Sequence, residues 1–178
     1  ADVETDLIIL PFVEGEQFLQ SVPGLSDATA GAVDRALTSQ EIQGKPYELF
    51  LTPILRGWRA TRVALIGAGR ASDFNLERIR RVATAAAMAA RQRHVARIAF
   101  MHRLPTQPQA VQLDPTEAVQ AITEGLMLAA FSGDRYKSQD RGGPAPEQML
   151  VVASGGAAAL ERAVERGRVL GESSNMAR

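Results

Sequence analysis

A glycine turn is the first candidate for chemistry in this chain. Gly67, Ala68 and Gly69 follow an apolar segment and precede an alanine-rich one. Glycines between a strand and a helix can bring backbone amides close to a phosphate at the helix N-terminus. The dinucleotide fingerprint is incomplete because its third glycine is replaced by Ser72, and no Gly-Lys-Ser/Thr follows to make a nucleoside triphosphate loop. We interpret the turn as structural, with a weak anion site as the alternative.

A basic stretch between Glu77 and Arg103 is the second candidate. It contains seven arginines and only one acidic residue, Glu77. On a helix and the strand after it, such a group could bind nucleic acid or an acidic partner. The residues proposed for this patch are Arg78, Arg81, Arg91 and Arg93. The alternative is a solvated arginine face that pairs with acids elsewhere in the fold.

The residue types of common catalytic and metal sites are sparse. Cysteine is absent, which excludes thiolate ligands, cysteine nucleophiles and disulfides, and fits a reducing cytoplasm. His94 and His102 lie at opposite ends of one predicted strand without an acidic pair nearby, and we interpret both as structural. Ser132 and Ser154 lack the Gly-x-Ser-x-Gly setting of a nucleophile. The sequence therefore predicts no catalytic, cofactor-binding or metal-binding residue.

A regular alternation of predicted strands and helices positions these residues. Short runs rich in branched apolar side chains predict strands at 7–13, 47–51, 62–66, 95–101 and 148–153. Apolar residues at helical spacing predict helices at 29–37, 75–92, 115–130 and 157–178. Asp73 or Asn75 would cap the second helix, and Asp114 with Pro115 would open the third. The alternation predicts a three-layer α/β fold, with a mostly parallel mixed sheet and helices on both faces.

Length and composition are those of one globular domain. The 178 residues are 46% hydrophobic and 22% charged, close to average soluble usage. Twenty basic and twenty acidic side chains cancel, so we expect no long-range field that would steer a charged partner. No apolar stretch approaches the roughly 18 residues that span a membrane, and no cleavable leader opens the chain. These features predict a soluble, cytoplasmic protein without a membrane partner.

Three segments resemble the leucyl aminopeptidase family. Residues 124–138 (EGLMLAAFSGDRYKS) are similar to its pattern of a Glu-Gly pair, small and apolar residues, an aromatic and a Tyr-Lys. Residues 163–178 resemble the helix by which family members pass toward their catalytic domain, and residues 62–69 resemble the family's central strand. The last helix stops at Arg178 without the glycine or proline that usually follows a helix. We therefore expect a boundary inside a longer protein.

The resemblance implies that residues 1–178 are a single, non-catalytic N-terminal accessory domain with a macro-domain-like fold, and that the catalytic domain is absent. The parent protein would be a metallo-aminopeptidase, a hydrolase that releases N-terminal amino acids from peptides. Its two divalent metals, Zn or Mn, would lie in the catalytic domain.

The resemblance also implies partners and a role. The domain would contact its own catalytic domain, and the full protein would be a homo-oligomer, a hexamer, in which this domain serves assembly and active-site access. Some bacterial members contribute to DNA binding through this domain, so a nucleic-acid or anion-binding module using residues 78–103 stays open as the alternative. The Asn-Ala-Ala-Asn stretch of ADP-ribose binders is missing, so nucleotide binding is not expected.

Overall fold

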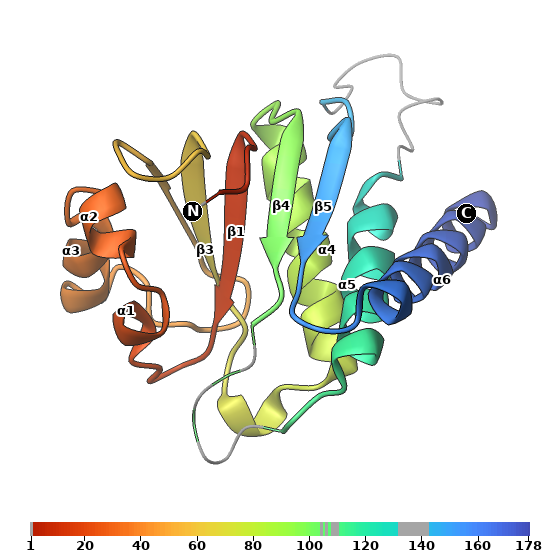
Figure 1. Ribbon diagram of the computed structural model, residues 1–178, viewed down its shortest axis with the longest axis horizontal. Helices are drawn as coiled ribbons and strands as arrows, with labels where there is room; N and C mark the ends of the chain where they lie inside the picture. Colours follow the sequence, from red (N-terminus) through yellow and green to blue (C-terminus); the bar gives the residue numbers. More distant parts are fainter. Residues whose placement is uncertain (1, 104, 106, 108–110, 132–142) are drawn as a thin grey trace.

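The computed structural model describes residues 2–178 except 104, 106, 108–110 and 132–142. A five-stranded sheet in the order β2-β3-β1-β4-β5 forms the centre of the protein (Figure 1). Its strands are β1 (Leu7–Phe12), β2 (Leu49–Pro53), β3 (Arg62–Gly67), β4 (Arg97–Met101) and β5 (Gln148–Val152). β1 pairs in parallel with β3 and β4, β4 pairs in parallel with β5, and β2 is antiparallel to β3. The predicted mostly parallel mixed sheet is confirmed.

The antiparallel edge strand β2 follows from the length of its connection. Only residues 54–61 join β2 to β3, whereas parallel neighbours need a crossover of a dozen or more residues. Pro53 closes β2, which suits an edge strand because proline cannot donate a backbone hydrogen bond to a neighbour.

Helices cover both faces of the sheet. α4 (Leu76–Gln92) and α5 (Pro115–Ala129) pack on one face, and α1 (Phe18–Ser21), α2 (Leu25–Ala28) and α3 (Ala32–Thr38) pack on the other (Figure 1). A short 3-10 helix, η1 (Ala71–Asp73), precedes α4. The last helix, α6 (Ala157–Met176), lies against α5 on the outside of the fold. The three-layer α/β prediction is thereby confirmed, with α6 as an addition outside the three layers.

The two central cores explain why β1 is an uninterrupted apolar run. Successive strand residues point to opposite faces of a sheet. Leu7 and Ile9 therefore enter the core beneath α4 and α5, whereas Ile8, Leu10 and Phe12 enter the core beneath α1–α3. A strand that is covered on both faces needs apolar residues at every position.

Both long central helices begin at a side-chain cap. The Oδ1 atom of Asn75 accepts a 2.8 Å hydrogen bond from the backbone N–H of Arg78, so Asn75 and not Asp73 caps α4. Asp114 caps α5 by accepting from the backbone N–H groups of Thr116 and Glu117. Each cap satisfies amides that the first turn of a helix leaves unpaired.

Some predicted boundaries were wrong for identifiable reasons. The helix predicted at 29–37 begins only at Ala32, as α3, because Ala30 and Gly31 take positive φ values of 48° and 72°; the residues before them form a separate short helix, α2, that was not predicted. The strand predicted to begin at Tyr47 begins at Leu49, since Tyr47 has a φ of 68° and forms a turn. The short helix α1 was not predicted at all. Of the helices that the structure describes, none combines the length and apolarity needed to cross a bilayer.

Candidate functional site

The glycine turn after β3 lies under a loop formed by residues 44–46. The backbone N–H groups of Gly67, Ala68 and Gly69 donate hydrogen bonds of 2.8 Å to the carbonyl oxygens of Glu48, Phe12 and Gly44, respectively. A Cβ atom on Gly67 would lie closer than 3.0 Å to the carbonyl oxygen of Lys45. The three backbone amides that an anion would need are therefore already hydrogen-bonded within the protein. The absence of a side chain at Gly67 leaves room for the backbone of Lys45. This geometry supports the structural interpretation of the turn.

The Glu124-Gly125 pair lies where α5 crosses α4. The Glu124 side chain is 11% exposed, and its carboxylate accepts a 2.6 Å hydrogen bond from Nε of Arg80 and a 2.9 Å hydrogen bond from Nε2 of Gln120. A Cβ atom on Gly125 would lie closer than 3.0 Å to the carbonyl oxygen of Arg80. One residue thus binds an arginine of α4, and the next leaves room for the α4 backbone.

Arg80 also belongs to an ion-pair network on the surface of α4. Glu77 accepts from Nη1 of Arg80 and, at 2.7 Å, from Nε of Arg81. These two hydrogen bonds, with that from Arg81 the stronger influence, hold the pKa of Glu77 below its usual range. Because the network lies on the surface, it contributes little to stability compared with the half-buried contact to Glu124.

The four arginines of the predicted basic patch lie at two ends of α4. Arg78 and Arg81 are in its first turns, and Arg91 and Arg93 are at its end, so the two pairs are about 20 Å apart at 1.5 Å per residue. Arg78 stacks 5.9 Å from the centre of the Tyr47 ring, and Arg81 pairs with Glu77. Arg91 donates to the carbonyl oxygens of Phe131 and Gly143. Arg93 donates to the carbonyl oxygen of Ala89. The two pairs therefore lie apart on α4, and each of the four arginines has at least one contact within the protein.

The histidines and serines form no catalytic arrangement within the described residues. His94 is exposed in the turn between α4 and β4. His102 is half-buried directly after β4, and burial lowers the pKa of its imidazole. Ser154 is exposed between β5 and α6, whereas Ser132, Tyr136 and Lys137 lie outside the described residues. In the part of the chain that the structure describes, no group of three or more His, Asp or Glu residues could hold a metal ion.

A buried ion pair between the ends of β1 and β4 was not found from the sequence. Arg103 Nη2 lies 2.7 Å from Glu16 Oε1, and the two side chains are 14% and 1% exposed. The guanidinium also donates to the carbonyl oxygen of Pro11 at 2.8 Å and to the hydroxyl of Ser21. Its Cζ atom lies 4.7 Å from the centre of the Phe18 ring. Arg103 therefore ties β4, β1 and α1 together.

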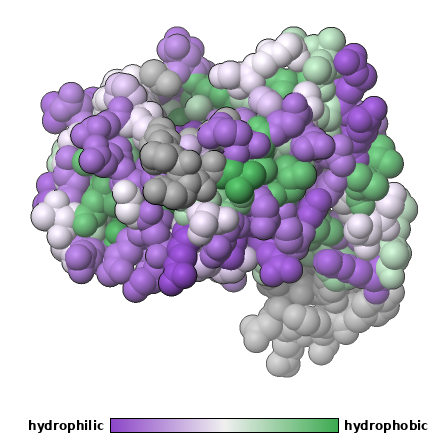
Figure 2. Space-filling view, turned by 90° about the horizontal axis from the view of Figure 1, so that it is seen from below, coloured by the Kyte–Doolittle hydropathy of each residue, from purple (hydrophilic) through white to green (hydrophobic). Residues whose placement is uncertain are grey.

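This ion pair occupies the position where open α/β sheets usually bind ligands. Ligands bind at the carboxyl ends of parallel strands, between neighbours whose connections leave toward opposite faces. Here the chain leaves β1 toward α1 and leaves β4 toward α5, on the other face (Figure 1). Seen from the side at which β1 and β4 end, most of the surface is hydrophilic, with small hydrophobic areas between the polar side chains (Figure 2). The fold fills its own crevice with Glu16 and Arg103, which are 87 residues apart.

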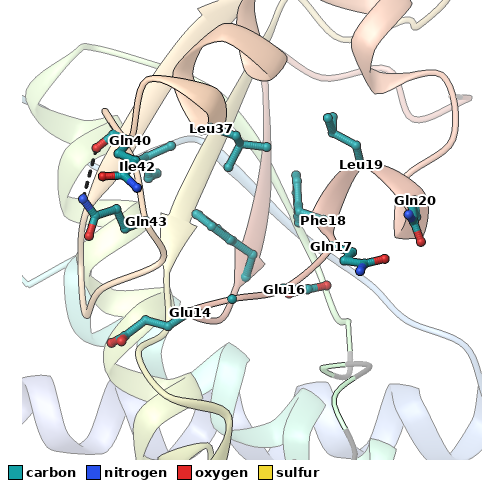
Figure 3. Close-up of a pocket in the computed structure, with 12 residues that line it drawn as sticks. Glu14, Glu16, Gln17, Phe18, Leu19, Gln20, Leu37, Gln40, Ile42 and Gln43 are labelled. Atoms are coloured by element: carbon teal, nitrogen blue, oxygen red, sulfur yellow. Dashed lines mark hydrogen bonds between the residues drawn. The ribbon is translucent and has the colours of Figure 1, made fainter.

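Beside the ion pair lies a groove of about 580 Å³ between residues 14–20 and residues 37–43 (Figure 3). Phe12, Phe18 and Ile42 form its buried floor, and Leu19 and Leu37 form half-buried sides. Exposed polar residues complete its rim: Gln17, Gln20, Gln40 and Gln43, with the half-buried Glu14. Sequence reasoning missed this groove because its two walls meet only through the fold.

Comparison with known proteins identifies the kind of domain to which this arrangement belongs. Residues 9–140 match the model of the cytosol aminopeptidase family, N-terminal domain. The chain belongs to the cytosol aminopeptidase family. It is 33% identical over 176 residues to a probable cytosol aminopeptidase of Solibacter usitatus, covering 99% of this chain and 32% of that protein. Against the Koribacter versatilis protein of the same description the identity is 31% over 191 residues, covering 100% and 37%.

The chain thus spans about a third of the length of the curated cytosol aminopeptidases that it matches. Among solved structures, a tomato leucine aminopeptidase mutant is similar with a TM-score of 0.71 and 21% identity, covering 93% of this chain and 33% of that one. The bottromycin maturation enzyme BotP in complex with Mn is similar with a TM-score of 0.65 and 21% identity, covering 98% and 31%. At such identities the likeness shows the fold alone.

Membership of the cytosol aminopeptidase family confirms the resemblance seen in the sequence, and the structure explains part of it physically. The Glu-Gly pair of the segment at 124–138 is the contact point of α4 and α5. The second half of that segment, from residue 132 onward, lies outside the described residues.

Proposed function

We propose that this chain is the non-catalytic N-terminal accessory domain of a metal-dependent aminopeptidase that releases N-terminal amino acids from peptides. The match of residues 9–140 to an N-terminal-domain model carries this proposal, together with relatives about three times as long that are named probable cytosol aminopeptidases. Glu124, which belongs to the segment that resembles the family, acts here in helix packing. Catalysis is accordingly assigned to the remainder of the full protein.

The two divalent metals, Zn or Mn, belong to the catalytic domain in this proposal. Such ions are held by several histidine, cysteine or carboxylate ligands that converge on one point. The described part of this chain brings no group of that kind together, so its residues do not fit the metals. No step of peptide hydrolysis is therefore derived for them.

The purified 178-residue chain is expected to show no hydrolysis of leucine p-nitroanilide, with or without added Mn or Zn. The reason is that the chain supplies no converging ligands and no placed nucleophile among its described residues. Release of nitroaniline, followed by absorbance, is the measurement, and the full-length protein with the same metals is the positive control. Metal-dependent turnover by the chain alone would contradict the proposal.

The accessory role is proposed to be assembly and active-site access in a cytoplasmic hexamer, through contact with the chain's own catalytic domain. Helix α6 supports this role. Ala163, Gly167 and Gly171 form its buried side against α5. Away from that side, Val169 and Met176 are 47% and 85% exposed. These exposed apolar positions on the outer side of α6 are the basis for proposing that this helix is covered in a larger assembly.

Val169→Asp in the full-length protein is expected to weaken assembly at least about tenfold, because a carboxylate would be placed in a contact that water leaves. Light scattering across a dilution series measures the effect. In the isolated chain the same change should leave thermal stability within about 0.5 kcal/mol, since Val169 is exposed there. Ser173→Asp, on the same helix at another exposed position, is the matched control. Unchanged assembly of the Val169 variant would argue against α6 as the contact surface.

A further inference from the structure

The groove between residues 14–20 and 37–43 has walls that are fixed without a ligand. On one side, Glu16 accepts hydrogen bonds of 3.2 Å from the backbone N–H of Val13 and from the hydroxyl of Ser21, in addition to its ion pair with Arg103. These contacts hold the segment that leaves β1. A preformed hollow of about 580 Å³ lies within the range of roughly 300–1,000 Å³ typical of sites for small ligands.

The opposite wall is held by a separate set of contacts. Oε2 of Glu48 accepts from the backbone N–H of Gln43 at 2.8 Å and from that of Lys45 at 3.1 Å. Nε2 of Gln43 donates to the carbonyl oxygen of Gln40 at 3.3 Å (Figure 3). Both walls are therefore built into the fold, so a ligand would not have to order them.

The floor and the rim of the groove have different chemistry. Phe12 and Phe18 lie 5.1 Å apart at the floor, and Leu19 and Leu37 border it from opposite walls, which suits an apolar side chain. The rim carries primary amide side chains on both walls, those of Gln17 and Gln20 on one and those of Gln40 and Gln43 on the other. Amide side chains donate and accept hydrogen bonds, as peptide groups do. Within the described residues, the side chains of Gln17 and Gln20 make no hydrogen bond of their own, so their donors and acceptors are available.

The charge of the groove is negative. Among the described residues, no lysine or arginine lines it, and the acids that do are Glu14 and Glu16. Glu16 is 1% exposed at its side chain and is neutralised by Arg103, which leaves the carboxylate of Glu14 at the rim. In the described residues that carboxylate has no ion-pair partner. The groove therefore favours a positively charged ligand and disfavours phosphates and nucleotides.

We propose that this groove is a binding site for a short peptide that carries one apolar side chain and a positive charge. The apolar side chain lies over Phe12 and Phe18 between Leu19 and Leu37. The peptide groups hydrogen-bond to the glutamines of the rim, and the positive charge lies next to Glu14. The site does not depend on the peptidase activity proposed above, because it is defined by binding and not by turnover.

The test is a titration of the isotope-labelled 178-residue chain, followed by nuclear magnetic resonance of backbone and glutamine side-chain amides. Three probes separate the contributions: Leu-Gly-Gly amide with a free amino terminus, acetyl-Leu-Gly-Lys amide with the charge on a side chain, and uncharged acetyl-Leu-Gly-Gly amide. The charged probes should shift the side-chain amide signals of Gln17, Gln20, Gln40 and Gln43 and should bind about tenfold more tightly than the uncharged one. Added salt should reduce that difference.

Glu14→Gln should remove the preference for charged probes, because it keeps the shape of the side chain and removes its charge. Glu41→Gln is the matched control, since Glu41 is exposed and lies between Gln40 and Ile42 in the same wall, but is not one of the residues that line the groove. Absence of shifts at the four glutamines with every probe at concentrations up to about 10 mM would overturn the proposal. Equal binding of charged and uncharged probes to the unchanged chain would also overturn it, whatever the variants do.

Discussion

Replacing Gly125 with alanine is expected to lower the free energy of unfolding by about 3 kcal/mol. The added Cβ would lie closer than 3.0 Å to the backbone carbonyl oxygen of Arg80, and close to the Cβ atom of Ala83. Neither neighbour is the flexible end of a side chain, so α4 and α5 would have to separate. Such a separation would also lengthen the contact between Arg80 and Glu124. Urea denaturation followed by circular dichroism measures the change.

Gly156→Ala is the matched control for that experiment. Gly156 precedes α6, has a φ of −70°, and has no atom within 4 Å of the position that a Cβ would take. The same chemical change there should alter the free energy of unfolding by no more than about 0.5 kcal/mol. A loss below about 1 kcal/mol for the Gly125 variant would show that the two helices can separate easily, and would contradict the close crossing.

Replacing Arg103 with methionine is expected to destabilise the chain by about 3–5 kcal/mol, because it leaves a buried carboxylate without its partner. Glu16 is 1% exposed at its side chain, so water cannot replace the lost guanidinium. The double variant Arg103→Met with Glu16→Gln should recover at least about 2 kcal/mol of that loss, since no unpaired charge is then buried. Chemical denaturation of the parent, the two single variants and the double variant gives the coupling between the residues.

An exposed arginine provides the comparison for Arg103. Arg168 pairs with Glu165 and Glu172 on the surface of α6, and its side chain is 46% exposed. Arg168→Met should cost no more than about 1 kcal/mol, because exposed ion pairs contribute little in water. If the Arg103 and Arg168 variants lost equal stability, burial would not be the reason for the importance of Arg103.

Local signals in the sequence were sufficient for most elements. The cap at Asn75 and the apolar spacing after it predicted α4, and Asp114 with Pro115 predicted the start of α5. Both signals act within a few residues of chain, where hydrogen bonding and side-chain spacing are independent of the rest of the fold. The short helix α1 was missed because four residues do not complete two turns, so no periodicity is visible.

The candidate sites were harder to predict because each is made by segments far apart in the chain. Glu16 and Arg103 are 87 residues apart, and neither lies in a motif. Each lies within a few residues of the carboxyl end of one of two neighbouring parallel strands, but that signal is usable only after the strand order is known. The arginines of α4 illustrate the opposite case. Their number suggested one patch, whereas the length of the helix separates the two pairs, and their partners lie partly on α4 itself and partly in other segments.

The sequence by itself determined the α/β class, the alternation of strands and helices, and the family, because these depend on local periodicity and on short runs of residues. The tertiary structure decided the order of the strands, the antiparallel direction of the edge strand β2, and which partner each polar residue contacts. It showed that Gly67 and Gly125 leave room for a neighbouring backbone, and that Arg103 fills the crevice at the carboxyl ends of β1 and β4. Contacts between distant segments follow from how the layers pack, and no local pattern records them.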